Sequence, residues 1–143
     1  MISRWSVMLG AVLPMMIAAP ANLPGQTRPS PDFSFYKSRV EPIFLRKKDG
    51  YTRCVVCHAA SNNNFNLERL SLGATSWTEE QSRRNFEMVL KLVTPGDPAT
   101  SRLMMHPLAP EAGGAAYHSG GRQFNSKDDP DWAVLAQFVN GQK

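Results

Sequence analysis

The chain contains two cysteines, and both lie in one five-residue motif, Cys54-Val55-Val56-Cys57-His58. This is the spacing C-x-x-C-H, which is typical of covalent haem attachment. Two thiols at this spacing lie on one helical turn, so each can add to one vinyl group of a haem and form a thioether bond. The histidine that follows is then placed to bind the iron from the same side. Because the motif occurs once, we expect one covalently attached haem c per chain, held by Cys54 and Cys57 with His58 as an iron ligand.

Three other interpretations of the motif remain open. A C-x-x-C pair can form a disulfide of the thioredoxin type, which usually accompanies a βαβ pattern that this sequence lacks. It can be half of a zinc site, although zinc generally takes four ligands and only His106 and His118 are available to complete the set. The pattern can also arise by chance. The adjacent histidine, and the N-terminal export pattern described below, favour haem.

The second axial position of the iron has several candidate ligands downstream of the motif. Met104 and Met105 stand at the end of an expected helix, His106 follows them directly, and His118 precedes a Ser-Gly-Gly run. A methionine ligand raises the reduction potential, whereas a second histidine generally gives a lower one. An open position would instead permit the binding of small ligands or catalysis. The glycines after His118 would let the backbone approach a cofactor closely.

The elements that must position these residues are expected to be helical, with long loops between them. Strand patterns are nearly absent, so the sequence predicts an all-α domain. Pro42 lies inside the first helix and predicts a kink or a fresh start there. Ser76 and Glu79 have the spacing of a capping box, and Asp129 precedes a proline at the start of the last helix. The expected helices cover about 34–48, 77–93, 98–105 and 130–141, and the expected loops cover 60–75 and 107–127.

The N-terminal residues have the pattern of a secretory signal peptide. Arg4 supplies a positive charge, an uncharged apolar run follows over 7–19, and small residues surround a cleavage point expected after Ala21. A retained membrane anchor is the alternative, but the run is short for a membrane span. We therefore expect a signal peptide over 1–21, a flexible linker over 22–33 and a haem domain over 34–143. The protein is then periplasmic or otherwise exported, with no membrane span after signal removal.

The charge of the chain is modest, a formal net +4, which does not argue for a nucleic-acid partner. Arg46, Lys47 and Lys48 form the one tight basic cluster. This cluster is either a docking patch for an acidic redox partner or a solvated helix end, where cations suit the helix dipole. Arg53 and Arg122 are candidates to pair with the haem propionates, and ordinary surface positions are an equally good interpretation of both.

Several short stretches around the motif resemble those of a known family, the single-haem cytochrome c domains of the group often called planctomycete-type. The resemblance spans about residues 36–141, and its specific part is C-x-x-C-H. The supporting stretches are Val40-Glu41-Pro42-Ile43-Phe44 before the motif, Pro95-Gly96-Asp97-Pro98 followed by Ser101-Arg102-Leu103 after it, and the closing Phe138-Val139-Asn140-Gly141.

The resemblance implies a small helical domain wrapped around one haem, with its first and last helices packed together. Similar domains carry a histidine followed by glycines near the position of His118, so we favour His118 as the distal ligand, with His106, Met104 and Met105 as alternatives. The implied function is one-electron transfer between redox proteins of the cell envelope, by a carrier rather than an enzyme. A haem-based sensor or binder of small ligands, or an electron-transfer subunit of a larger oxidoreductase complex, remains the alternative.

Overall fold

The structure is a computed structural model that describes residues 29–59 and 62–143. In this part of the chain all regular structure is helical, and the expected all-α class is confirmed. The one β-type contact there is an isolated bridge between Leu108 and Phe124. The expected signal peptide over 1–21 lies outside the described residues, as does most of the linker expected over 22–33. None of the helices in the described part has the length and apolarity that a membrane crossing needs.

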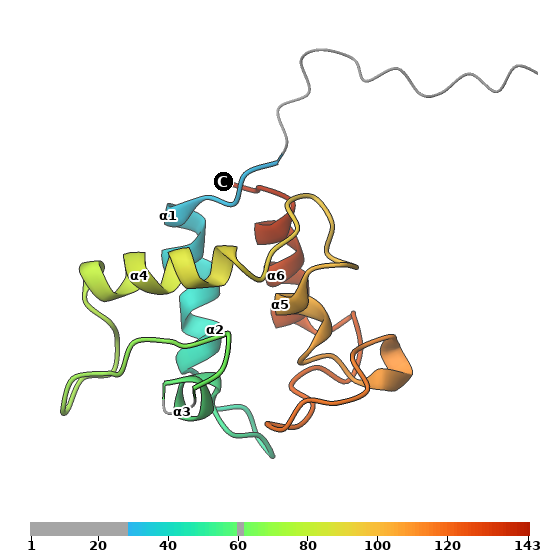
Figure 1. Cartoon of the computed structure of the whole chain (residues 1–143), viewed down its shortest axis with the longest axis horizontal. Helices are drawn as coiled ribbons and strands as arrows, with labels where there is room; N and C mark the ends of the chain where they lie inside the picture. Colours follow the sequence, from blue (N-terminus) through green and yellow to red (C-terminus); the bar gives the residue numbers. More distant parts are fainter. Residues whose placement is uncertain (1–28, 60–61) are drawn as a thin grey trace, which may run out of the picture.

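The helices follow one another along the chain with long irregular connections (Figure 1). Their bounds are α1 Phe33–Phe35, the π-helix η1 Tyr36–Val40, α2 Glu41–Leu45, α3 Cys54–His58, α4 Glu79–Leu90, α5 Arg102–Met105, the 3-10 helix η2 Pro110–Ala112 and α6 Pro130–Val139.

The first three elements form one continuous helical run from Phe33 to Leu45 with a widened turn in its middle. The Glu41 N–H bonds to the carbonyl of Tyr36, five residues back, which defines the π turn. Pro42 follows immediately and has no N–H to donate, so the irregularity lies where proline was expected to disturb the helix. The run ends at Leu45, three residues before the predicted end.

The caps of the later helices agree with the sequence at one position and differ at another. Helix α6 begins at Pro130, as the Asp129-Pro130 pair predicted, and the Asp129 carboxylate caps it by accepting from the Asp131 N–H. The capping box of α4 is formed by Thr78 and Gln81, with both reciprocal bonds present, so the predicted box at Ser76 and Glu79 is wrong. Thr78 provides the same hydroxyl chemistry two residues later in the chain.

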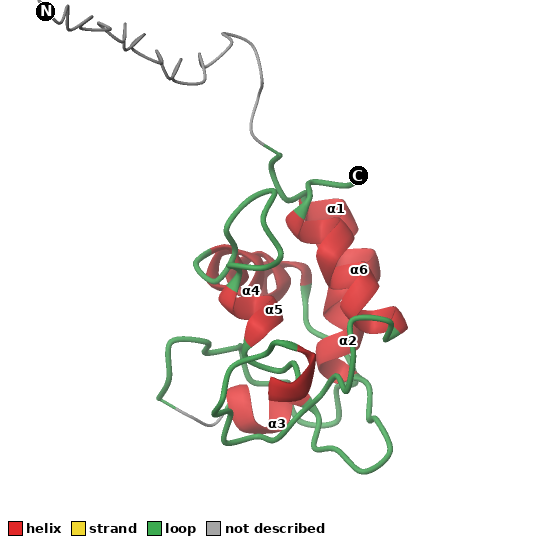
Figure 2. Ribbon diagram, turned by 90° about the vertical axis from the view of Figure 1, so that its right-hand side faces the viewer, coloured by secondary structure: helices red, strands yellow, loops and turns green. Residues whose placement is uncertain are grey.

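An aromatic cluster joins the first helical run to the last helix. Tyr36 and Phe138 are fully buried, and their ring centroids lie 6.1 Å apart. Phe86 of α4 contacts both rings. Burying side chains of this size contributes about 1.5–3 kcal/mol each. The packing of the first helical run against α6, which the resemblance implied, is therefore present. Helix α3 contacts the α2 end of this run and lies at the opposite end of the molecule from α1 (Figure 2).

Candidate functional site

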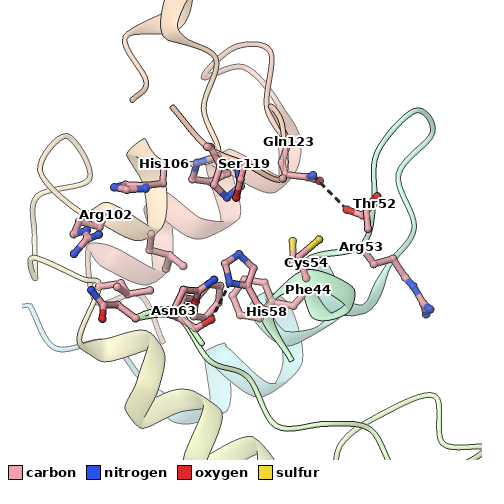
Figure 3. Close-up of a pocket in the computed structure, with 18 of the residues that line it drawn as sticks. Phe44, Thr52, Arg53, Cys54, His58, Asn63, Arg102, His106, Ser119 and Gln123 are labelled. Carbon is pink, nitrogen blue, oxygen red and sulfur yellow. Dashed lines mark hydrogen bonds between the residues drawn. The ribbon is translucent and has the colours of Figure 1, made fainter. Parts of the chain in front are cut away.

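A cavity of about 540 Å³ opens beside α3. One wall is formed by α3 and residues 62–65, and the facing wall by the start of α5 and residues 117–124 (Figure 3). Side chains of α2 and α6 also line it. The volume lies within the range of about 300–1,000 Å³ that is usual for small-molecule and cofactor sites.

The lining of the cavity is apolar with few charges. Apolar side chains come from every wall: Ile43, Phe44, Phe65, Leu92, Leu103, Phe124 and Leu135. The charged residues among the described lining are Arg53 and Arg102, and no carboxylate is among them. Such a lining suits a large apolar ligand that carries anionic groups at its edge.

His58, the last residue of α3, lies in the wall with its ring directed into the cavity (Figure 3). Its Nδ1 donates to the carbonyl of Phe65 at 2.8 Å. Burial lowers the pKa of the imidazole, although hydrogen bonds to the Phe65 carbonyl and to Asn63 oppose this effect. The bond from Nδ1 to the Phe65 carbonyl orients the ring and leaves Nε2 as the nitrogen that could bind a metal ion.

His118 faces His58 from the opposite wall. The ring centroids lie 6.2 Å apart, and the ring planes differ by 16°. The Nδ1 of His118 donates to the carbonyl of Gly121 at 2.6 Å, so it too offers Nε2. Two metal–nitrogen bonds of about 2.0–2.1 Å, with about 1.1 Å from each nitrogen to its ring centre, give about 6.3 Å. The observed spacing therefore leaves room for one metal ion between the two imidazoles.

The structure separates the other candidates for the distal position. His106 lines the same cavity, and its pKa is lowered by burial and then by the neighbouring charge of Arg102. Met104 is completely buried in the hydrophobic core. Neither Met104 nor Met105 is among the residues that line the cavity. The fold thus brings His118 opposite His58, His106 to the side, and the methionines elsewhere.

Both cysteines line the cavity, and they are not bonded to each other. Burial raises the pKa of the Cys54 thiol to about 11, whereas thioredoxin-type cysteines have a lowered thiol pKa. The described residues also contain no group of three His, Cys, Asp or Glu side chains that could hold a metal ion together. Both thiols are placed beside the cavity that His58 also lines.

The structure places the two candidate arginines differently from each other. Arg53 lines the cavity, but its guanidinium is directed away from His58 (Figure 3). Arg122 pairs with Glu111 at 2.9 Å and does not line the cavity. Arg102, which lies beside His106, was not identified from the sequence. Its only sequence cue was its place within the Ser-Arg-Leu stretch, because a single arginine has no periodicity to detect.

The basic cluster at 46–48 lies at the C-terminal end of α2, whose C-cap is Arg46. Helix α2 ends before it, and Arg46 and Lys48 form ion pairs with Asp131 and Asp129 at the start of α6. Lys47 alone of the three makes no such pair and is exposed.

Comparisons of the chain with family models, with curated proteins and with solved structures found no match.

Proposed function

We propose that this protein is an exported mono-haem c-type cytochrome that transfers single electrons between redox partners in the cell envelope. The observation that carries the proposal is the pairing of His58, which directly follows both cysteines, with His118 across an apolar cavity at 6.2 Å. Such a donor set suits a haem, because the macrocycle supplies the remaining ligands that the protein lacks.

Each residue of the site has a distinct role in this proposal. Cys54 and Cys57 would hold the haem through thioether bonds, so the cofactor cannot leave an open cavity. His58 and His118 would bind the iron from its two sides. Arg102 would pair with a propionate at the edge of the cavity, where no carboxylate competes for it. When bound, the haem supplies an iron that cycles between Fe(III) and Fe(II).

Two features of the protein favour electron transfer over binding of external small ligands. Both imidazoles are oriented by hydrogen bonds to backbone carbonyls of Phe65 and Gly121, which fixes both ligand positions before any metal binds. Cys57 is exposed, and Tyr117, which also lines the cavity, is 80% exposed. A cofactor in the cavity would therefore present an edge to solvent, where a redox partner can approach.

The test is a spectroelectrochemical titration of the mature protein, made in a host with cytochrome c maturation machinery. We expect a reversible transition with a one-electron slope of about 59 mV per decade and sharp bands in the reduced spectrum. C54S/C57S should lose covalently bound haem in a stain after denaturing electrophoresis. A protein without visible absorbance, or one whose reduced form binds carbon monoxide as fast as a five-coordinate haem, would contradict the proposal.

A further inference from the structure

A set of contacts joins two segments that are far apart in the sequence, namely residues 46–53, which lead into α3, and residues 107–129, which carry His118. Lys48 lies at the centre of this set. Its ammonium donates to the carbonyl of Gln123 at 3.1 Å and forms an ion pair with Asp129. It also lies 4.9 Å above the ring centre of Phe124, so one side chain makes three different contacts with the second segment.

The same connection is made in the reverse direction by Gln123. Its side-chain amide donates to the carbonyl of Thr52 at 3.3 Å, a bond that is visible in Figure 3. Its backbone N–H donates to the carbonyl of Pro107 at 2.8 Å, and the residue is only 9% exposed. A third link joins Tyr51 and Asn125 at 3.1 Å. Gln123 is therefore bonded both to the segment that precedes Cys54 and to Pro107, two residues after the end of α5.

The contacts of Gln123 lie close in sequence to the Gly121 carbonyl, which orients the imidazole of His118. The Gly121 carbonyl that accepts from the imidazole precedes Gln123 by two residues. The Gly121 N–H donates back to the His118 carbonyl at 2.9 Å, so residues 118–121 form one closed turn. On its other side this loop is joined to α5 by the bond between the Ala115 N–H and the Met105 carbonyl, at 2.8 Å. The position of His118 thus depends on anchors at both ends of a short segment.

We propose that Lys48 and Gln123 are positioning residues that form a latch, and that this latch keeps His118 opposite His58 and so decides whether the distal position is open to external ligands. The inference rests on the proposed haem site. Within the basic cluster it assigns a structural role to Lys48, which acts on His118 through the 107–129 segment and touches neither histidine. Lys47, its exposed neighbour, carries the same charge and makes none of these contacts.

The test compares K48M with K47M, which removes the same charge one residue earlier. In K48M we expect carbon monoxide to bind the reduced protein about tenfold faster, because charge-assisted hydrogen bonds that favour the closed loop are lost. The oxidised spectrum should gain a high-spin component. K47M should match the unmodified protein. Hydrogen exchange of the backbone amides in 115–124 is measured without any spectroscopic signal from the haem. This exchange should be faster in K48M than in K47M.

The variant Q123M keeps the backbone acceptor for Lys48 but removes the donor to Thr52, and we expect the same direction of change from it. It provides an independent test if K48M does not accumulate as folded protein. Carbon monoxide binding and amide exchange that are equal in K48M, Q123M and K47M would overturn the latch, as would a lowered thermal midpoint with unchanged ligand binding. A parent protein without covalent haem would instead contradict the proposed function, so the two failures are distinguishable.

Discussion

Removal of the His118 side chain is the perturbation that tests the geometry of the site most closely. The ring centroids of the two imidazoles stand 6.2 Å apart, close to the separation that would leave room for one metal ion between them. Binding at both positions therefore needs little movement of the chain. We expect the form with an open distal position to be about 1% of the unmodified protein, which lies within the usual range for a minor state.

In H118A the open form becomes the whole population, so the apparent affinity for added imidazole should rise about 100-fold. The assay is an optical titration of the oxidised protein with imidazole, which converts a high-spin spectrum to a low-spin one. The matched controls are H106A, which removes the other cavity histidine, and M104L, a volume-conserving change in the core. Both should bind imidazole within about twofold of the parent protein.

The distal assignment would be refuted if H118A stayed low-spin with unchanged affinity for imidazole. If H106A instead gave the high-spin spectrum and the higher affinity for imidazole, His106 would be the distal ligand. The position of His118 opposite His58 would then have another cause. A high-spin spectrum in M104L alone would point to methionine ligation and to rearrangement of the core.

Three further predictions concern the loop, the core and the charge of the cavity. In G114A the new Cβ would lie 2.0 Å from the carbonyl oxygen of Leu108. The thermal midpoint of unfolding should therefore fall by an amount that corresponds to about 1–3 kcal/mol or more. An unchanged midpoint would argue against this loop conformation. The Tyr36 hydroxyl is buried without a hydrogen-bond partner among the described residues, and burial strongly raises its pKa. Y36F should therefore raise the free energy of unfolding in urea by about 1 kcal/mol, and a clear loss of stability would contradict this. R102Q should lower the reduction potential measured at low ionic strength, because a cation near the haem carboxylates is removed. The control R39Q, which changes an exposed arginine, should leave the potential unchanged. Equal potentials in the two variants would show that Arg102 does not act on the haem.

Local sequence rules accounted for much of the helical framework. The start of α6 at Pro130 and the irregular turn at Pro42 were predictable, because each depends on residues within one helical turn. The helical conformation of the C-x-x-C-H motif also follows from the chemistry that its spacing serves. The α4 cap was placed two residues too early because both Ser76 and Thr78 can cap a helix, and local pattern does not choose between them.

The parts that the sequence did not predict depend on contacts between distant residues. The early end of α2 accompanies the pairing of Arg46 with Asp131, which is 85 residues away. Lys48 and Gln123 are 75 residues apart. Neither periodicity nor spacing contains such information, so the basic cluster could only be assigned a surface role. His118 was the favoured distal candidate from the sequence, but the contacts that hold its loop were not predictable, since only the folded chain brings those residues together.

Covalent attachment of haem can be read from the intact mass of the denatured protein, purified from cells with cytochrome c maturation machinery. We expect one species with the mass of the mature chain plus one haem, and the same increment on the peptide that contains Cys54 and Cys57. The mass of the bare chain, with free thiols or a disulfide at these positions, would contradict covalent haem attachment and with it the proposed electron-transfer function.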